Sequence, residues 1–194
     1  MTPDLSRFSN AWYDPGRSLA VRALWFFCGL PLVRSRLVPG SGWRRAVLRS
    51  FGARIGPAVV IKPGVRVKYP WLLSVGAHSW IGEEVWIDNL APVAFGDNVC
   101  VSQGAYLGTG NHDWTDPAFG LVVRPVTLGN GAWVGARALI CPGVTVGECG
   151  VAASGSVVAK SIPPREIHAG NPAAFVRMRR IKDELPADQP VFCA

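Results

Sequence analysis

Aliphatic residues return at every sixth position along much of the chain between residues 55 and 158. This spacing matches neither the 3.6-residue period of an α-helix nor the two-residue alternation of an ordinary strand. The register is held by Ile55, Ile61, Val67, Val75, Ile81, Ile87, Val101, Leu107, Leu128, Val134, Ile140, Val146, Ala152 and Val158. A fixed period of this kind predicts a repeat fold in which one short unit stacks on the next.

A glycine directly follows many of these aliphatic residues, as in Ile55-Gly56, Ile81-Gly82 and Val134-Gly135. Glycine provides the backbone conformations that a tight corner needs. Short strands joined by corners, each with one inward aliphatic side chain, are typical of a parallel β-solenoid with triangular coils. A β-sandwich would show period-two alternation instead. The sequence therefore predicts an all-β solenoid, a parallel β-helix, over residues 55–162.

Interruptions of the repeat predict where loops leave the solenoid wall. Two steps take eight residues in place of six, after Val67 and after Ile87, and one step takes 21 residues, after Leu107. The longest interruption predicts an extruded loop over residues 109–125, which contains the polar run Gly110-Asn111-His112-Asp113. Loops on a rigid scaffold often carry binding and catalytic groups, so we expect function to concentrate here.

Several motifs make the chain resemble a known family. They are Phe51-Gly52-Ala53-Arg54-Ile55-Gly56, Tyr69-Pro70-Trp71, Ser102-Gln103-Gly104-Ala105-Tyr106-Leu107, Gly110-Asn111-His112-Asp113 followed by Pro117-Ala118-Phe119, and Gly170-Asn171-Pro172-Ala173. With these motifs the chain resembles the hexapeptide-repeat acyltransferases, in particular the acetyltransferases of colanic acid and related exopolysaccharide synthesis. The galactoside, maltose and nodulation O-acetyltransferases are related to these. The resemblance covers nearly the whole chain and implies a left-handed β-helix that assembles as a homotrimer.

The resemblance implies that His112 is catalytic, with Asn111 and Asp113 beside it. Moving an acetyl group from a thioester to a hydroxyl requires a base for the hydroxyl proton, and imidazole ordinarily titrates near neutral pH. We therefore expect His112 to act as a general base, without a covalent intermediate. The second ring nitrogen needs a partner, and Asp113, Asp116, Asp88 or a backbone carbonyl could provide it.

The resemblance also implies that acetyl-coenzyme A is the co-substrate and lies in a groove between two prisms. The residues that match its binding positions are Trp133, Gly135, Ala136, Ser154, Gly155, Lys160, Arg177 and Arg180. Two positions depart from the family pattern, since Ala159 stands where a threonine is common and Ala174 where a basic residue is common. The phosphates of acetyl-coenzyme A could therefore bind Arg179, Arg180 or Lys182 instead. The alternative interpretation of this basic run is a solvent-exposed face without a ligand.

For the acceptor, Asp88 and Asn89 follow an inward aliphatic residue one or two coils before His112. The resemblance implies that an Asn or Asp in this region holds the sugar, while a turn at a prism corner is the alternative interpretation of both residues. Aromatic side chains can stack on a sugar ring, and we select Trp114 in the extruded loop as a further candidate. The expected acceptor is a sugar or a lipid-linked glycan.

The segment before the repeat, residues 1–54, combines apolar runs with many arginines. Its uninterrupted apolar stretch, residues 23–33, has eleven residues and contains a proline, so it is too short to span a bilayer. It also lacks the flanks and the cleavage site of a secretory leader. Two alternatives stay open: one or two helices that pack on the prism, or an arginine-rich peripheral contact with a membrane.

At the other end, Asn171-Pro172 has the composition of a helix start, with asparagine as the N-cap and proline in the first turn. We expect a C-terminal helix over residues 172–184, with the basic residues near its end that the helix dipole favours. The chain then divides into a helical, arginine-rich segment (1–54), the hexapeptide-repeat β-helix (55–162) and a C-terminal helix with a tail (163–194).

Composition narrows the chemistry further. His78, His112 and His168 lie 34 and 56 residues apart, unlike the closely spaced ligands of a zinc site, so we expect no metal. The five cysteines have no framework spacing, which favours a reducing cytoplasm. The arginine-rich segment leaves open a location at the inner face of the membrane. The net charge of +7 suits phosphates or an anionic membrane. No nucleic-acid-binding motif is present, so we expect no nucleic acid as partner.

Together these observations predict an acetyl-coenzyme A-dependent O-acetyltransferase acting on a sugar hydroxyl of an exopolysaccharide or other surface-glycan precursor. Two alternatives stay open at this point. An N-acyltransferase that takes an amino sugar could use the same histidine base. A non-catalytic hexapeptide-repeat scaffold would keep the prism but would not need the Asn111-His112-Asp113 loop.

Overall fold

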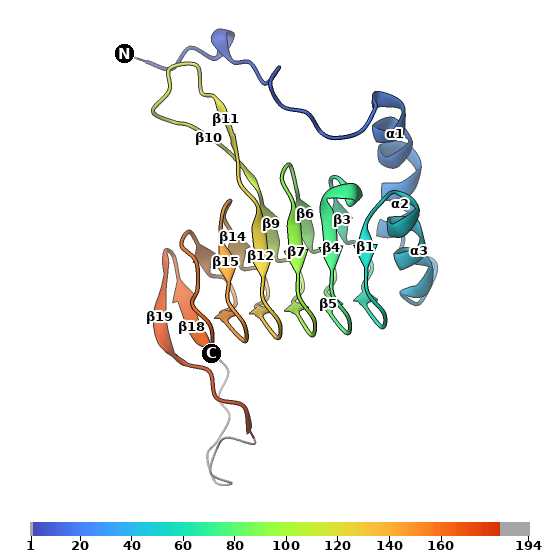
Figure 1. Ribbon diagram of the computed structural model, residues 1–194, viewed down its shortest axis with the longest axis vertical. Helices are drawn as coiled ribbons and strands as arrows, with labels where there is room; N and C mark the ends of the chain where they lie inside the picture. Colours follow the sequence, from blue (N-terminus) through green and yellow to red (C-terminus); the bar gives the residue numbers. More distant parts are fainter. Residues whose placement is uncertain (1, 183–194) are drawn as a thin grey trace.

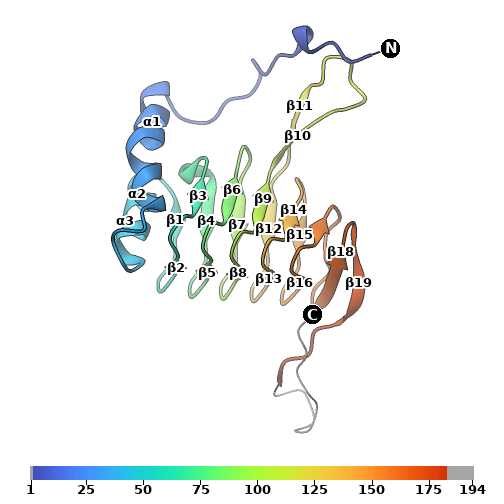
Figure 2. The same ribbon diagram turned by 180° about the vertical axis from the view of Figure 1, so that it is seen from behind.

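The computed structural model describes residues 2–182 of the chain. Its centre is a parallel β-solenoid that runs from β1 to β17, with helices at the β1 end and a hairpin of β18 and β19 at the other end (Figures 1 and 2). The predicted all-β solenoid with an N-terminal helical segment is therefore confirmed.

The coils are triangular, and each of the three walls is a sheet of stacked parallel strands. Face A consists of β1 (Arg54–Ile55), β4 (Leu73–Val75), β7 (Val93–Phe95), β12 (Val126–Leu128) and β15 (Thr145–Val146). Face B begins with β2 (Val60–Ile61), β5 (Trp80–Ile81), β8 (Cys100–Val101), β13 (Trp133–Val134) and β16 (Val151–Ala152). Face C consists of β3 (Arg66–Val67), β6 (Trp86–Asp88), β9 (Tyr106–Gly108), β14 (Leu139–Ile140) and β17 (Val157–Val158). The chain passes from A to B to C in each coil, and we name each corner by the two faces that it joins.

Each face contributes one aliphatic side chain per coil toward the axis, which gives the solenoid a continuous core. Ile61, Leu107 and Ile140 from the six-residue register are all at most 1% exposed. The corners are tight, since a Cβ on Gly135 would lie 2.5 Å from the backbone N of Ser154 in the next coil. Glycine after the aliphatic residue therefore lets neighbouring coils approach to strand spacing.

The three walls differ in the residue that precedes each core aliphatic and points outward. On face A this outer row is polar or small: Arg54, Ser74, Ala94, Thr127 and Thr145. On face B it is Val60, Trp80, Cys100, Trp133 and Val151. On face C it is Arg66, Trp86, Tyr106, Leu139 and Val157. Faces B and C therefore carry apolar and aromatic surface, and their three tryptophans are exposed in this single chain.

The N-terminal helices close the first coil. α1 (Leu19–Leu24), the π-helical η2 (Trp25–Gly29) and α2 (Leu30–Arg34) follow one another without a break, and α3 (Gly42–Ser50) packs against α2. Trp25, Val33 and Leu48 join the solenoid core, and Nε1 of Trp25 donates to the Val67 carbonyl at 3.0 Å. Among residues 2–182, no helix has the length and apolar character that crossing a bilayer requires.

The extruded loop is a β-hairpin that leaves the C–A corner of the prism (Figure 1). β10 (Gly110–His112) pairs antiparallel with β11 (Leu121–Val123). A shorter bulge at the same corner carries the 3-10 helix η3 (Pro70–Leu72). The beginning of the chain, with the 3-10 helix η1 (Leu5–Arg7), reaches the hairpin, and Asp4 N donates to the Pro117 carbonyl at 2.8 Å. The segment is thus more regular than its polar sequence indicated.

The helix predicted over residues 172–184 is wrong in the part of that range that the structure describes. β18 (Glu166–Gly170) and β19 (Ala173–Met178) form an antiparallel hairpin that extends face B. Asn171-Pro172 is the turn between these strands and not a helix start. β18 pairs with β16 of the last coil, and this sheet edge offers a hydrogen-bond ladder that overrides the local helix signal. The tail, residues 183–194, lies outside the described residues.

Candidate active site

His112 ends strand β10, and its ring lies beside Phe119 of the same hairpin and Phe8 of the N-terminal segment. The ring stacks on Phe119 with centroids 4.5 Å apart and 11° between the planes, and Phe8 lies at 5.6 Å. Nδ1 of His112 lies 2.9 Å from the Phe119 backbone oxygen. A carbonyl oxygen can only accept, so Nδ1 carries the proton in this contact, and the neutral ring keeps its lone pair on Nε2.

The nearby acidic residues have other partners. Oδ1 of Asp113 accepts hydrogen bonds from N and Oγ1 of Thr115 at 2.9 and 2.6 Å, which hold the pKa of its carboxyl below the usual value. The Asp116 carboxylate accepts from N of Ala118 at 2.9 Å and from N of Gly120 at 3.2 Å. Of the four partners that sequence reasoning left open for the His112 ring, the geometry thus supports the backbone carbonyl.

The Asn111 side chain holds the backbone of the next residue, His112. Its Oδ1 accepts from the His112 backbone N at 2.8 Å, so the side chain braces the peptide that carries the histidine. Trp114, the aromatic candidate of the hairpin, is 79% exposed. It therefore presents its ring to solvent in the single chain.

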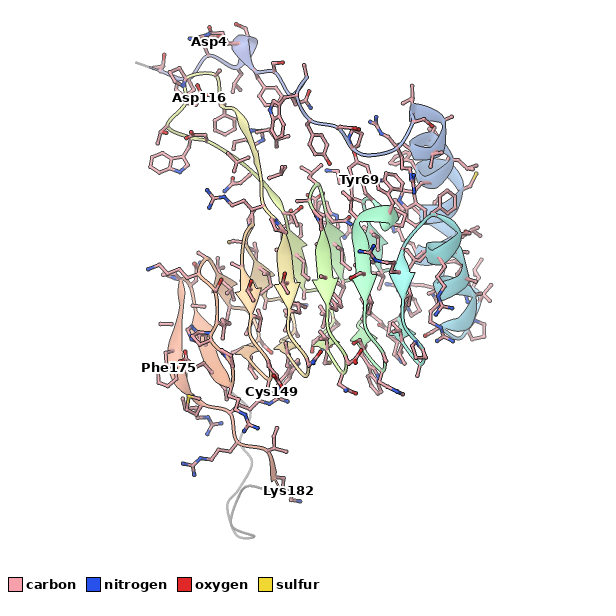
Figure 3. All side chains as sticks on the ribbon, in the orientation of Figure 1. Asp4, Tyr69, Asp116, Cys149, Phe175 and Lys182 are labelled. Carbon is pink, nitrogen blue, oxygen red and sulfur yellow. The ribbon has the colours of Figure 1, made fainter. Side chains whose placement is uncertain are left out.

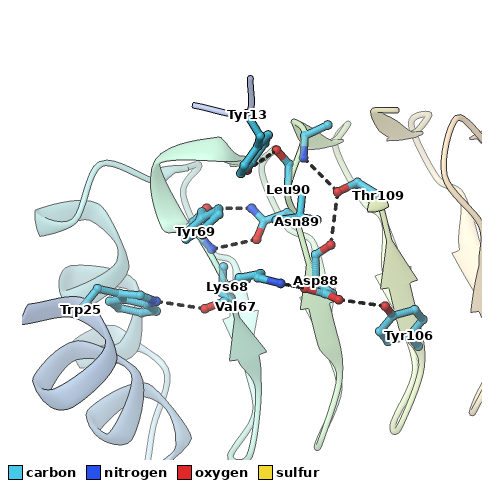
Figure 4. A network of polar contacts seen from close by, with 11 residues as sticks. Tyr13, Trp25, Val67, Lys68, Tyr69, Asp88, Asn89, Leu90, Tyr106 and Thr109 are labelled. Atoms are coloured by element: carbon cyan, nitrogen blue, oxygen red, sulfur yellow. Dashed lines mark hydrogen bonds and ion pairs between the residues drawn. The ribbon is translucent and has the colours of Figure 1, made fainter. Parts of the chain in front are cut away.

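Asp88 lies at the end of β6, at the C–A corner, one coil before the hairpin (Figure 4). Its carboxylate forms an ion pair with Nζ of Lys68 at 2.9 Å and accepts from the Tyr106 hydroxyl at 3.0 Å. Burial and the negative charge of Asp88 raise the pKa of Tyr106 to about 12, so the phenol stays protonated and keeps donating. Asp88 is half-buried, and a polar ligand at this corner would meet its carboxylate.

Asn89 has a structural role at the prism corner, which was the alternative interpretation of its sequence position. It is fully buried, its Oδ1 accepts from Tyr69 N at 2.9 Å, and its Nδ2 donates to Tyr69 O at 2.7 Å (Figure 4). The Asn89 amide thus makes the two hydrogen bonds that a paired strand would make, and it joins its own C–A corner to the C–A corner of the preceding coil. Because the amide is fully buried and both its ends are occupied, the predicted sugar contact of Asn89 does not fit this geometry. Both oxygens of Asp88 also have partners, but Asp88 borders a pocket and so still fits the predicted contact.

The N-terminal segment runs along the C–A corners from the hairpin to α1 (Figures 1 and 3). Besides the contact of Asp4 with the hairpin, the Tyr13 hydroxyl donates to the Leu90 carbonyl at 2.7 Å, and Nε1 of Trp71 donates to the Pro15 carbonyl at 2.6 Å. Sequence reasoning did not predict that this N-terminal segment lies along the corners, and so it did not predict Phe8 beside His112. No periodicity marks the segment, so no signal in the sequence could have found it.

The residues expected to hold the donor form a second group. Trp133 lies on the outer row of face B, and its Nε1 donates to Oγ of Ser102 at 2.9 Å. Gly135, Ala136, Ser154 and Gly155 lie in stacked turns at the B–C corner, where Gly155 N donates to the Ala136 carbonyl at 2.8 Å. Lys160 lies at the C–A corner of the last coil.

The basic residues after the prism are spread over the C-terminal hairpin. Arg177 on β19 and Arg180 beyond it are exposed. Nη1 of Arg179 instead donates to the carbonyls of Gly131 and Cys149, at 2.8 and 3.3 Å, and so ties the hairpin to the A–B corners. Arg179 is therefore engaged within the fold, whereas Arg177 and Arg180 present their charge to solvent.

These two groups do not meet within one chain. His112 belongs to the C–A corner, whereas Trp133 belongs to face B, which is the wall opposite that corner in a triangular coil. The solenoid core fills the space between them. A single chain therefore keeps the residues expected for catalysis apart from those expected to hold the donor.

A pocket of about 490 Å³ lies between the helical segment and face C. Phe26 and Leu30 give it an apolar side, and Arg22, Lys68 and Asp88 give it charged groups. Asp88 thus borders both this pocket and the corner next to the His112 hairpin.

Metal ligands and reactive thiols do not gather in the described residues. No group of three His, Cys, Asp or Glu side chains there could hold a metal ion, and His168 contacts Glu166 at 2.8 Å. Burial raises the pKa of the Cys100 and Cys141 thiols, which disfavours the nucleophilic thiolate.

Comparison with known proteins identifies the family. No family model matches the chain. WcaF of Escherichia coli strain K12, named as a colanic acid biosynthesis acetyltransferase, is 36% identical over 182 residues, which are 91% of this chain and 97% of that protein. The chain belongs to the hexapeptide-repeat acetyltransferases. The galactoside O-acetyltransferase of the same strain is 29% identical over 73% of this acetyltransferase and 71% of its own length.

Solved structures agree with this family. The hexapeptide-repeat acetyltransferase VCA0836 from Vibrio cholerae superposes with a TM-score of 0.74 at 25% identity, over 82% of this chain and 90% of that one. A galactoside acetyltransferase in complex with coenzyme A gives a TM-score of 0.73 at 25% identity, over 88% and 84%. The left-handed β-helix expected of this acetyltransferase is thereby confirmed.

Proposed function

We propose that this acetyltransferase moves an acetyl group from acetyl-coenzyme A to a sugar hydroxyl of an exopolysaccharide or other surface-glycan precursor. The observation that carries the proposal is the His112 ring, which Phe119 fixes so that the Nε2 lone pair is left for a substrate proton. The names of similar proteins support the two substrate classes. WcaF is named for colanic acid biosynthesis, and the galactoside acetyltransferase was solved with coenzyme A.

In the proposed reaction, Nε2 of His112 takes the proton of the sugar hydroxyl while the hydroxyl oxygen attacks the thioester carbonyl carbon. Negative charge then develops on the carbonyl oxygen. The Gly135 N–H already donates to the Ala152 carbonyl at 2.8 Å, so we assign the Ala136 N–H as the donor to this oxyanion. The C–S bond breaks, the ester carbonyl re-forms, and the coenzyme A thiolate takes the proton back from His112. No protein residue is acylated.

The donor half of the site uses the residues expected for acetyl-coenzyme A. Trp133 offers an apolar ring to the pantetheine arm, and the B–C corner turns with Ser154 and Gly155 offer backbone and small side chains beside it. The exposed Arg177 and Arg180, together with Lys160, offer positive charge to the phosphates.

The two groups of residues meet when copies of the chain lie side by side as a homotrimer. Ala136 lies at the B–C corner and His112 at the C–A corner, and in a cyclic trimer these two corners meet when face B of one copy lies against face A of the next, with the A–B corners at the threefold axis. This contact brings Trp133 of one copy toward the C–A corner with His112 of its neighbour. Cyclic closure with one such contact per pair gives the trimer.

The acceptor enters along the C–A corner in this proposal. Asp88 holds a sugar hydroxyl, and Trp114 on the hairpin covers a ring face. The neighbouring pocket has an apolar side at Phe26 and Leu30 and a cationic side at Arg22 and Lys68. This combination suits a glycan linked through phosphate to a lipid. We propose that class of acceptor and place the reaction in the cytoplasm.

The test measures O-acetyl groups on the surface polysaccharide of cells of the source organism from which the gene has been deleted. Restoring the wild-type chain should return alkali-labile acetate, and restoring His112→Ala should not. His78→Asn is the matched control, because His78 lies at the A–B corner with a positive φ that asparagine tolerates. Full acetylation with His112→Ala would overturn the proposal, and acetate that resists alkali would point to an amide on an amino sugar.

A further inference from the structure

The helical segment that closes the first coil has exposed apolar side chains beyond the side that packs on the solenoid. Trp25, Gly29 and Val33, four residues apart, form its buried side. Leu24 and Phe27 lie outside this buried side and are 55% and 73% exposed, and Phe27 also borders the pocket against face C. The exposed apolar residues of this segment and the turn after it, which we name the apolar cap, are Leu19, Leu24, Phe26, Phe27, Leu32, Leu37 and Val38. Exposed apolar clusters of this size usually bind a partner.

Positive charge accompanies the apolar cap. Residues 15–82, which form the helices, the first coil and part of the second, contain eleven Lys or Arg and no Asp or Glu, and of these cations Arg36 is paired with Glu84 of the second coil. Three of these arginines, in α3, donate to backbone carbonyls: Arg44 to Val33, Arg45 to Val59 and Arg49 to Ile55. Arg17 and Arg34 are exposed at the two ends of the helical segment. The apolar cap is thus framed by cations, which favours an anionic partner.

We infer that the apolar cap docks on the surface of a bilayer that contains anionic phospholipids. Leucine and phenylalanine side chains enter the interface between headgroups and acyl chains, while arginines bind the phosphates. Charge complementarity and the apolar side chains together favour a lipid surface over a second copy of the chain, which carries the same positive charge. The inference concerns a membrane contact that the acetyl-transfer proposal does not require.

The place of the cap in the fold suits this role. The helices lie at the β1 end of the solenoid, opposite the β18–β19 hairpin (Figures 1 and 2). A trimer with its solenoids side by side leaves this end uncovered and turns three caps toward the same plane. Three weak contacts on one assembly bind a surface far more tightly than one does.

The experiment is co-sedimentation of the full-length protein with vesicles of phosphatidylcholine, with and without phosphatidylglycerol. We expect the wild-type protein to sediment with the anionic vesicles and to be released by salt. The double variant Leu24→Gln/Phe27→Ser should lower the bound fraction by roughly ten-fold or more. The control Phe175→Ser/Val176→Ser changes two exposed apolar residues of β19 at the opposite end and should bind like the wild type.

A second pair of variants separates charge from apolar insertion. Arg17→Gln/Arg34→Gln should weaken binding to anionic vesicles and remove most of its salt dependence. Light scattering of every variant checks its assembly, and circular dichroism checks its fold. A wild-type protein that does not bind anionic vesicles would overturn the inference. So would an apolar-cap variant that dissolves a larger protein assembly, because the cap would then be a contact between copies of the chain.

Discussion

A backbone carbonyl, and not a carboxylate, is the partner of the His112 ring. The sequence pointed to His112 through its loop and motif, because a long interruption of a regular repeat is visible in one chain. It could not choose between the carboxylates and a carbonyl as partner, because that choice depends on how the hairpin folds back to bring the Phe119 carbonyl 2.9 Å from Nδ1. The contact of Phe8 with His112 was not predictable for the same reason, since Phe8 lies near the N-terminus, more than 100 residues before His112.

Because His112 and Asp113 have different roles in the hairpin, we expect their substitutions to lower kcat by different amounts. His112→Ala should lower kcat for acetyl transfer by roughly 10² to 10⁴, with the Kd for acetyl-coenzyme A changed only a few-fold. Asp113→Asn should lower kcat by less than about ten-fold, because Asp113 braces Thr115 and not the imidazole. Its lowered pKa also keeps Asp113 ionised through neutral pH, so the variant should not move the pH profile of kcat. Equal losses in the two variants would contradict this assignment.

Among the elements, the periodic ones were predictable and the pairing-dependent ones were not. The six-residue register fixes which side chains enter the core and where corners fall, so the coils and the position of the hairpin follow from it. Asn171-Pro172 resembles a helix start, but the free edge of face B recruits the segment as strands, and a sheet edge is a property of the assembled fold. The sequence likewise could not tell a sugar-binding Asn89 from one that spans two corners.

The corner function of Asn89 predicts a loss of stability. Asn89→Ala leaves the Tyr69 backbone N–H without its acceptor, while the Tyr69 carbonyl keeps the hydrogen bond from Leu72 N at 3.0 Å. We expect the free energy of unfolding to fall by about 1 to 3 kcal/mol, measured by denaturant titration. Gln103→Ala, at an exposed corner position, should change it by less than about 0.5 kcal/mol. An Asn89→Ala protein of unchanged stability but with a raised KM for the acceptor would restore the sugar-binding role.

In the whole molecule, the uneven walls matter most. The outer rows of faces B and C are apolar and aromatic while face A is polar, and the six-residue repeat alone does not reveal this, because it assigns only the inward positions. The difference in polarity between the walls becomes clear once each strand is assigned to its face. His112 and Trp133 lie apart in one chain because one belongs to the C–A corner and the other to the opposite wall, and the proposed trimer brings His112 of one copy to Trp133 of the next.

The most direct test of this shared site mixes two inactive variants. His112→Ala lacks the base, and Ala136→Trp should block the donor half, which calorimetry with acetyl-coenzyme A can verify as lost binding. Mixed trimers from co-expression are assayed for acetyl-coenzyme A consumption with glycan extracted from the gene-deleted cells. If each site takes its base from one copy and its donor half from another, random mixing restores about a quarter of the wild-type activity. Activity no higher than that of either variant alone would contradict the shared site.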